Sequence, residues 1–145
     1  MRSNLFYLLN DFFKENYDSF KIDMAFLYGS YAFKKEKESS DIDIEILFSD
    51  GLKEEEKFNF LTEISYILEK KIKKEVNIIS LSKDFPDPCF YYDVIVLGNV
   101  LFYRNFDDYV KFKLEALYQF EDFQIFGMEW KKELMRKRLK EFGYD

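Results

Sequence analysis

Residues 27–44 of this 145-residue chain have the sequence LYGSYAFKKEKESSDIDI, and they decide its fold. The apolar run over 23–28 predicts a short strand that ends at Gly29. Acidic residues then alternate with isoleucines from residue 41, which predicts a second strand over 41–48. Because glycine has no Cβ, the backbone at Gly29 can turn tightly and a ligand can approach it closely. The stretch therefore predicts two strands whose connection begins with a ligand-binding turn.

Gly29 and Ser30 are the candidate nucleotide-binding residues. A helix is expected to begin at Ser30, and the free N–H groups at a helix start bind phosphate oxygens. The serine hydroxyl adds a further donor. A Gly-Ser turn is common by itself, so its meaning depends on the residues after it.

Asp41 and Asp43 are the candidate metal ligands and catalytic residues. Two residues apart on a strand, their side chains share one face, and the opposite face is apolar and belongs in the core: Ile42, Ile44 and Ile46. Neighbouring carboxylates repel one another unless a cation lies between them, and carboxylate oxygens suit Mg²⁺. A triphosphate at the Gly-Ser turn and Mg²⁺ at the two aspartates would form one nucleotide site.

Composition narrows the chemistry further. The chain has a net charge of −6 and no histidine, which excludes histidine bases and argues against a nucleic-acid substrate. Its one cysteine, Cys89, forms no internal disulfide, so a reducing cytoplasm is the expected location. No stretch has the pattern of a targeting segment or a membrane span.

The remaining pattern predicts a single α/β (α+β) domain over residues 1–145. Its core is expected over about 20–104, and a helical segment follows over about 106–142. The expected helices are 3–17, 53–72, 91–97 and 106–124, and the expected further strands are 75–81 and 100–103. Strands interleaved with helices predict a mixed sheet with flanking helices.

The C-terminal segment ends in a basic stretch. Gly127 is expected to interrupt the helical pattern, so that a separate basic helix follows over 129–142. Such a helix either binds an acidic partner surface or RNA, or is simply solvated.

The pair Gly29-Ser30, followed after ten residues by Asp41-Ile42-Asp43, resembles the signature of the polymerase-beta nucleotidyltransferase superfamily. The resemblance extends from about Asp23 to about Phe123. Size and element order resemble the minimal nucleotidyltransferase (MNT) antitoxins, which pair with a HEPN-fold RNase toxin. The resemblance implies a nucleotidyltransferase fold, bound Mg²⁺, ATP as substrate, and transfer of AMP to a tyrosine hydroxyl of the toxin. Two alternatives stay open: a binding-only antitoxin with a vestigial site, and nucleotidyl transfer to a small molecule. A homodimer and a hetero-oligomer are both compatible with the sequence.

One departure from the superfamily pattern bears on activity. The resemblance implies a third carboxylate on the next strand, but Asn77 stands at that position. An amide is a weak, neutral ligand, so transfer is expected to be reduced while nucleotide binding survives. Glu75 and Glu45 are candidates to compensate. The alternative is that both are surface carboxylates paired with lysines such as Lys73 or Lys74.

Overall fold

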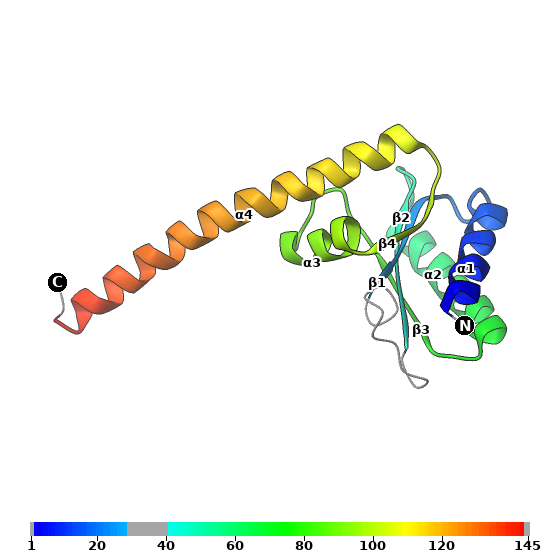
Figure 1. Cartoon of the computed structure of the whole chain (residues 1–145), viewed down its shortest axis with the longest axis horizontal. Helices are drawn as coiled ribbons and strands as arrows, with labels where there is room; N and C mark the ends of the chain where they lie inside the picture. Colours follow the sequence, from blue (N-terminus) through cyan, green and yellow to red (C-terminus); the bar gives the residue numbers. More distant parts are fainter. Residues whose placement is uncertain (1, 29–40, 144–145) are drawn as a thin grey trace.

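The computed structural model describes residues 2–28 and 41–143, which form a mixed sheet with helices on both faces (Figure 1). The elements are, in chain order, α1 (Arg2–Asn16), β1 (Ile22–Tyr28), β2 (Ile42–Phe48), α2 (Glu54–Ile72), β3 (Val76–Ser80), α3 (Pro88–Tyr92), the π-helical turn η1 (Asp93–Leu97), β4 (Asn99–Tyr103) and α4 (Phe106–Glu141). The predicted helices and strands of the core are therefore confirmed to within a few residues.

The four strands lie in the order β3-β2-β1-β4. β1 is antiparallel to both of its neighbours, whereas β2 and β3 are parallel and are connected through α2. A parallel pair needs such a long crossover, while an antiparallel pair does not. The sheet is therefore mixed, as predicted, with β3 at one edge and β4 at the other.

Alternation along β2 divides the core into two layers. The three isoleucines of β2 are fully buried against α1 and α2, as predicted. The opposite face carries Asp43, Glu45 and Leu47, and Leu47 packs in a second apolar cluster with residues of β1, η1 and α4. Figure 1 shows the same division, with α1 and α2 on one side of the sheet and α3 and α4 on the other. The acidic residues of β2 therefore face the α3–α4 side.

The short helix begins earlier than predicted. Asp87 caps it, since its Oδ1 accepts the N–H of Phe90 at 3.2 Å, and Pro88 suits the first helical position. The expected helix over 91–97 is consequently α3 followed by the turn η1. β4 starts at Asn99, one residue earlier than the strand expected over 100–103.

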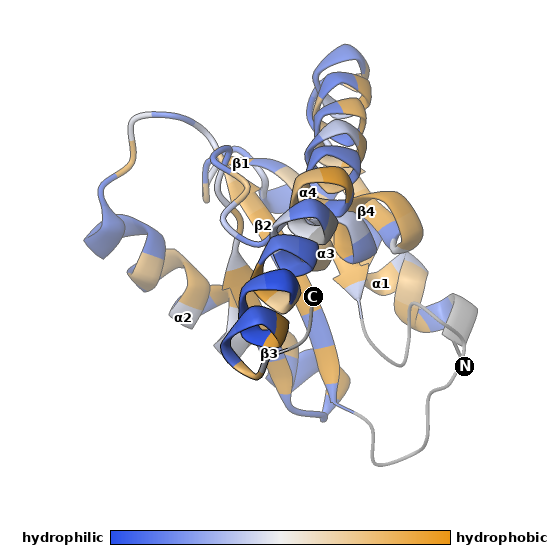
Figure 2. Ribbon diagram, turned by 90° about the vertical axis from the view of Figure 1, so that its left-hand side faces the viewer, coloured by the Kyte–Doolittle hydropathy of each residue, from blue (hydrophilic) through white to orange (hydrophobic). Residues whose placement is uncertain are grey.

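The C-terminal segment is one helix, so the predicted interruption at Gly127 is wrong. A helical glycine costs only about 1 kcal/mol, and Gln124 and Glu129 on either side of it are good helix formers. The 36 residues of α4 span about 54 Å at 1.5 Å per residue. Polar and apolar residues mix along α4 (Figure 2), and its C-terminal half extends well beyond the sheet (Figure 1). Within the described ranges, no helix is long and apolar enough to cross a bilayer.

Candidate active site

Asp43 lies in the middle of a row of three side chains across the sheet. Tyr28 of β1 pairs with Asp43 of β2, and Asp43 pairs with Asn77 of β3. The Asn77 side-chain amide donates to the Asp43 carboxylate, with 3.3 Å between Nδ2 and Oδ1. The structure therefore places the residue at the expected third acidic position directly beside the central aspartate.

Asp41 lies just before β2 and is exposed. The N–H of Ile42 donates to the carbonyl of Glu75 at 3.0 Å, which brings the residues before β2 and β3 side by side. Glu75 is also exposed, so both carboxylates are open to solvent at this end of the sheet. Gly29 and Ser30, together with the helix expected from Ser30, lie outside the described residues. Gly29 directly follows Tyr28 in the chain.

Glu45 is not a surface carboxylate, which corrects one of the two alternatives. Only 1% of the residue is exposed, and its Oε1 has no hydrogen-bond partner among the described residues. Burial, and secondly the negative charge of Asp43, raise the pKa of Glu45 from 4.5 to about 8. Glu45 is therefore largely protonated at neutral pH. The expected surface position is therefore wrong for Glu45.

The site has two further neighbours, Tyr28 and Asp93, which the sequence analysis did not identify. The pKa of Tyr28 is raised by burial and then by the charges of Asp93, Glu45 and Asp43, so the phenol lies near all three acids. The ring of Phe90 packs edge-on against Tyr28, with 5.5 Å between centroids. Asp93 comes from η1, far along the chain, and no spacing in the sequence connects it to Asp43.

Gly98 allows η1 to lie close to β1. A Cβ at this position would overlap the carbonyl oxygen of Val94 and would lie 3.2 Å from the carbonyl oxygen of Leu27. Only a residue without a side chain fits between η1 and the end of β1. The glycine thereby helps to fix where η1, and Asp93 with it, meets the sheet.

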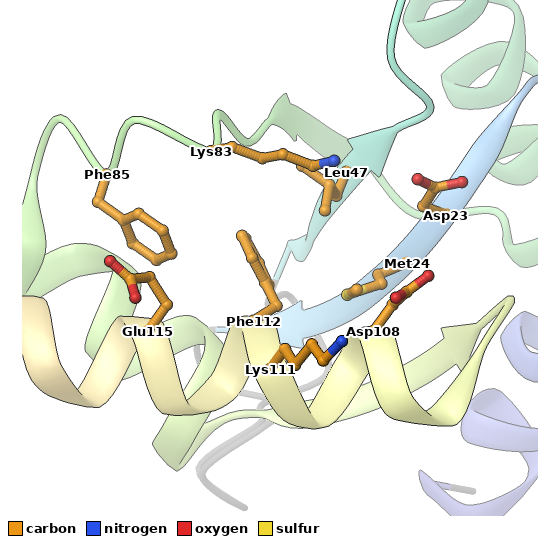
Figure 3. A pocket seen from close by; sticks show the side chains of 9 residues that line it. All are labelled: Asp23, Met24, Leu47, Lys83, Phe85, Asp108, Lys111, Phe112 and Glu115. Carbon is orange, nitrogen blue, oxygen red and sulfur yellow. The ribbon is translucent and has the colours of Figure 1, made fainter.

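A hollow of about 430 Å³ lies near the opposite ends of β1 and β2, against α4 (Figure 3). Its lining mixes acids, lysines and aromatic rings, and several of the charged groups have partners. Lys83 pairs with Asp50 at 3.1 Å, and Asp23 accepts from Ser49 at 2.6 Å and contacts Arg104 Nε at 3.3 Å. The lining side chains carry charges of both signs, and several of them are already paired. Such a hollow does not indicate a triphosphate site.

A family model described as polymerase beta, nucleotidyltransferase matches residues 9–107. The chain belongs to this nucleotidyltransferase family. The match contains the row of Tyr28, Asp43 and Asn77 and the connection from β3 to the start of α4. No curated protein sequence matches the chain.

Solved structures with the same fold come from toxin–antitoxin systems. One, a toxin–antitoxin with AMP-PNP, matches with a TM-score of 0.65 and 17% identity, over 87% of this chain and 98% of that one. A second, the toxin–antitoxin MntA-HepT, gives 0.61 and 16% identity over 89% and 98%. A third is a tri-AMPylated Shewanella oneidensis HEPN toxin in complex with MNT antitoxin, with 0.61 and 19% identity over 93% and 99%. At these identities the likeness shows the fold.

The donor set of Asp41, Asp43 and Asn77 fits a magnesium ion that completes its shell with other ligands. Across the described ranges, no three acidic or thiol side chains converge closely enough to hold a metal by themselves. Asp41 and Asp43 offer two carboxylates, and the amide of Asn77 is already engaged with Asp43. Mg²⁺ commonly uses one or two carboxylates and completes its shell with water and substrate phosphates. These residues therefore suit Mg²⁺ shared with a triphosphate.

Proposed function

We propose that the protein is a Mg²⁺-dependent nucleotidyltransferase that serves as the antitoxin of a toxin–antitoxin pair. It transfers AMP from ATP to a tyrosine hydroxyl of a HEPN-type RNase toxin. The observation that carries the proposal is the position of Asp43 between Tyr28, which leads into Gly29 and Ser30, and Asn77 on β3. The proposal is supported by the membership of the nucleotidyltransferase family. It is also supported by the fold shared with toxin–antitoxin structures, one of which contains an AMPylated toxin.

The proposed roles follow from the residue types. Gly29 and Ser30 bind the phosphates, and Asp41 and Asp43 hold Mg²⁺. The ion, when bound, offsets negative charge on the phosphates as the reaction proceeds. The tyrosine oxygen forms a bond to the α-phosphorus, the bond from that phosphorus to pyrophosphate breaks, and the hydroxyl proton is released to solvent. Asp41 and Asp43 act through the metal ion: they orient the reacting phosphate and form no bond to it themselves.

Activity is expected to be lower than in a protein with three acids at the site. Asn77 supplies an amide on β3, and Glu45 is protonated and buried, so neither adds a negative charge for the metal. The proposed location is the cytoplasm, since the single cysteine needs no oxidising compartment.

A binding-only antitoxin is the second candidate, and the neutral Asn77 is the observation that favours it. In that case the protein blocks the toxin by contact, and the nucleotide site is vestigial. Transfer to a small molecule is a third candidate, which no feature of the described residues favours over transfer to a protein.

The experiment incubates the protein with labelled ATP, Mg²⁺ and the cognate HEPN-type protein. Label on a tyrosine of the partner, lost in Asp41→Asn and Asp43→Asn, supports the proposed transfer. Asp50→Asn, an exposed acid on the turn after β2, is the matched control and keeps wild-type transfer. Inhibition of the toxin without label, unchanged in both variants, would establish the binding-only antitoxin instead.

A further inference from the structure

A groove of about 670 Å³ lies between α2 and β3, at the free edge of the sheet. Three large apolar side chains at this groove are exposed to solvent: Phe58 at 68%, Tyr66 at 59% and Ile79 at 48%. Contiguous exposed apolar surface around a groove is typical of interaction sites. Among the described residues that line it, Glu69 is the one charged side chain, so the groove suits neither phosphates nor a polyanion.

The backbone of β3 is open toward this groove. The Ile42 N–H donates to Glu75 O at 3.0 Å, and the Leu81 N–H donates to Ile46 O at 2.8 Å. In a parallel pair with this register, alternate residues of β3 face β2. The backbone groups of the residues between them, including Ile78, therefore face outward.

Side chains of α2 cover only the beginning of that outer edge. Ser65 Oγ donates to Val76 O at 3.0 Å, and Glu69 Oε1 accepts the Val76 N–H at 3.0 Å. Two residues further along, Ile78 has no such cap within the part of the chain that the structure describes. Its N–H and C=O are thus positioned to pair with an additional strand, which is how extended peptides bind an open sheet edge.

The groove is continuous with the candidate active site. Asn77 lines the groove and also donates to Asp43 at 3.3 Å. On the other side of Asp43 lies Tyr28, which leads into the proposed phosphate turn at Gly29. In an in-line displacement the attacking and leaving oxygens lie on opposite sides of the phosphorus. If the leaving phosphates bind at Gly29 and Ser30, next to β1, the attacking hydroxyl is expected to arrive from the β3 side.

We propose that the α2–β3 groove binds an extended segment of the acceptor protein, which adds to the sheet beside β3 and presents its hydroxyl at Asp43. This inference rests on the proposed transferase function and names the binding site of its second substrate. The acceptor segment pairs with the backbone at Ile78 and packs its apolar side chains against Phe58 and Tyr66. Phosphate and metal binding do not require this surface.

The test measures AMP transfer to the cognate HEPN-type protein at varied acceptor concentration. The double variant Phe58→Ala/Tyr66→Ala is expected to raise the KM for the acceptor about tenfold, the size of effect typical of interface anchors. Binding of a fluorescent ATP analogue stays at the wild-type level. Tyr7→Ala is the matched control, since Tyr7 is 64% exposed on α1, away from the groove, and it leaves both quantities unchanged.

A second variant, Ile78→Pro, removes the outward N–H and leaves the bonds to β2 in place, as edge strands tolerate. It is expected to raise the same KM, whereas Ile78→Ala, which keeps the N–H, raises it less. Should Ile78→Pro fail to fold, the double variant Phe58→Ala/Tyr66→Ala still tests whether the groove binds the acceptor. A wild-type KM in the double variant overturns the groove as the acceptor site. A second result would also overturn it: the wild type forms a dimer, the double variant does not, and the KM is the same in both. The groove would then bind a second copy of this chain.

The two proposals fail in different ways. If the wild type transfers no label yet binds the HEPN-type protein, the transferase function is wrong. The groove is then tested by the affinity of that complex, which the double variant weakens if the groove holds the partner and leaves unchanged if it does not.

Discussion

Asn77 holds the carboxylate of Asp43 by a hydrogen bond across the β2–β3 pair, with 3.3 Å between Nδ2 and Oδ1. The pairing gives Asp43 a fixed neighbour without adding negative charge. An acid at the same position would face Asp43 directly, and the two carboxylates would need a cation between them. Asn77 thus contributes an amide at the expected third position and adds no negative charge there with which to hold a metal ion.

Restoring the acid should therefore increase activity. In Asn77→Asp the two carboxylates lie opposite one another, which destabilises the free protein by up to about 1 kcal/mol. Mg²⁺ relieves the repulsion, so the Tm of the variant should rise with Mg²⁺ more than that of the wild type. Transfer should increase about tenfold or more and saturate at lower Mg²⁺. Titrations of Tm and of labelled transfer measure both effects.

The control is Asn77→Ala, which loses the hydrogen bond and gains no charge. It should show neither the Mg²⁺-dependent Tm nor the gain in transfer. If Asn77→Asp likewise shows no gain, the missing acid is not what limits the reaction.

Glu45 should make stability depend on pH. Its folded pKa of about 8 lies above the ordinary 4.5, so between these values the folded protein binds a proton that the unfolded chain has lost. Stability therefore falls as pH rises from about 4.5 through 8, by an amount on the order of a few kcal/mol. Glu45→Gln is neutral throughout and should lose this slope, so its stability relative to wild type is higher at pH 8.5 than at pH 5.

Urea denaturation at several pH values measures the slope. Glu75→Gln is the control: it removes an exposed carboxylate near the same strands and should leave the profile parallel to wild type. Parallel profiles for Glu45→Gln and wild type would show that Glu45 titrates alike in the folded and unfolded states.

Two glycines should respond to alanine in opposite ways. Gly98→Ala places a methyl group against the Val94 carbonyl and should cost about 1–3 kcal/mol of stability, as overpacking typically does. Gly127→Ala meets only the Phe123 ring, at 3.9 Å, and improves helix propensity, so it should not destabilise α4. Thermal unfolding of the two variants compares them directly, and equal Tm values would contradict the close contact at Gly98.

Local patterns were sufficient to predict the strands that carry the site. The alternation along β2 identified both its buried isoleucines and the side on which Asp43 lies, because side chains of a strand alternate between faces. The same alternation does not indicate how deeply each side chain is buried, so it did not show that Glu45 is buried while Asp43 is only half-buried. Asp93 reaches the site through the packing of η1 against β1, a contact that no spacing encodes. The unbroken α4 was missed because one glycine weakens a helix without ending it.

Trp130 should report on the C-terminal half of α4. It is the single tryptophan of the chain, and it is 64% exposed among other exposed apolar residues of α4: Phe126, Leu134, Met135 and Leu139. Since the indole is largely exposed, its emission in the free protein should already be that of an indole in water and should shift little on urea unfolding. Truncation after Phe126 should change the free energy of unfolding by less than about 1 kcal/mol, because the described side chains beyond it are exposed and only the glycine at 127 is partly covered. The contradicting result is a blue-shifted emission in the free protein that is lost in Leu134→Asp but kept in Lys137→Asp. It would show that the apolar residues in the C-terminal half of α4 are covered in solution.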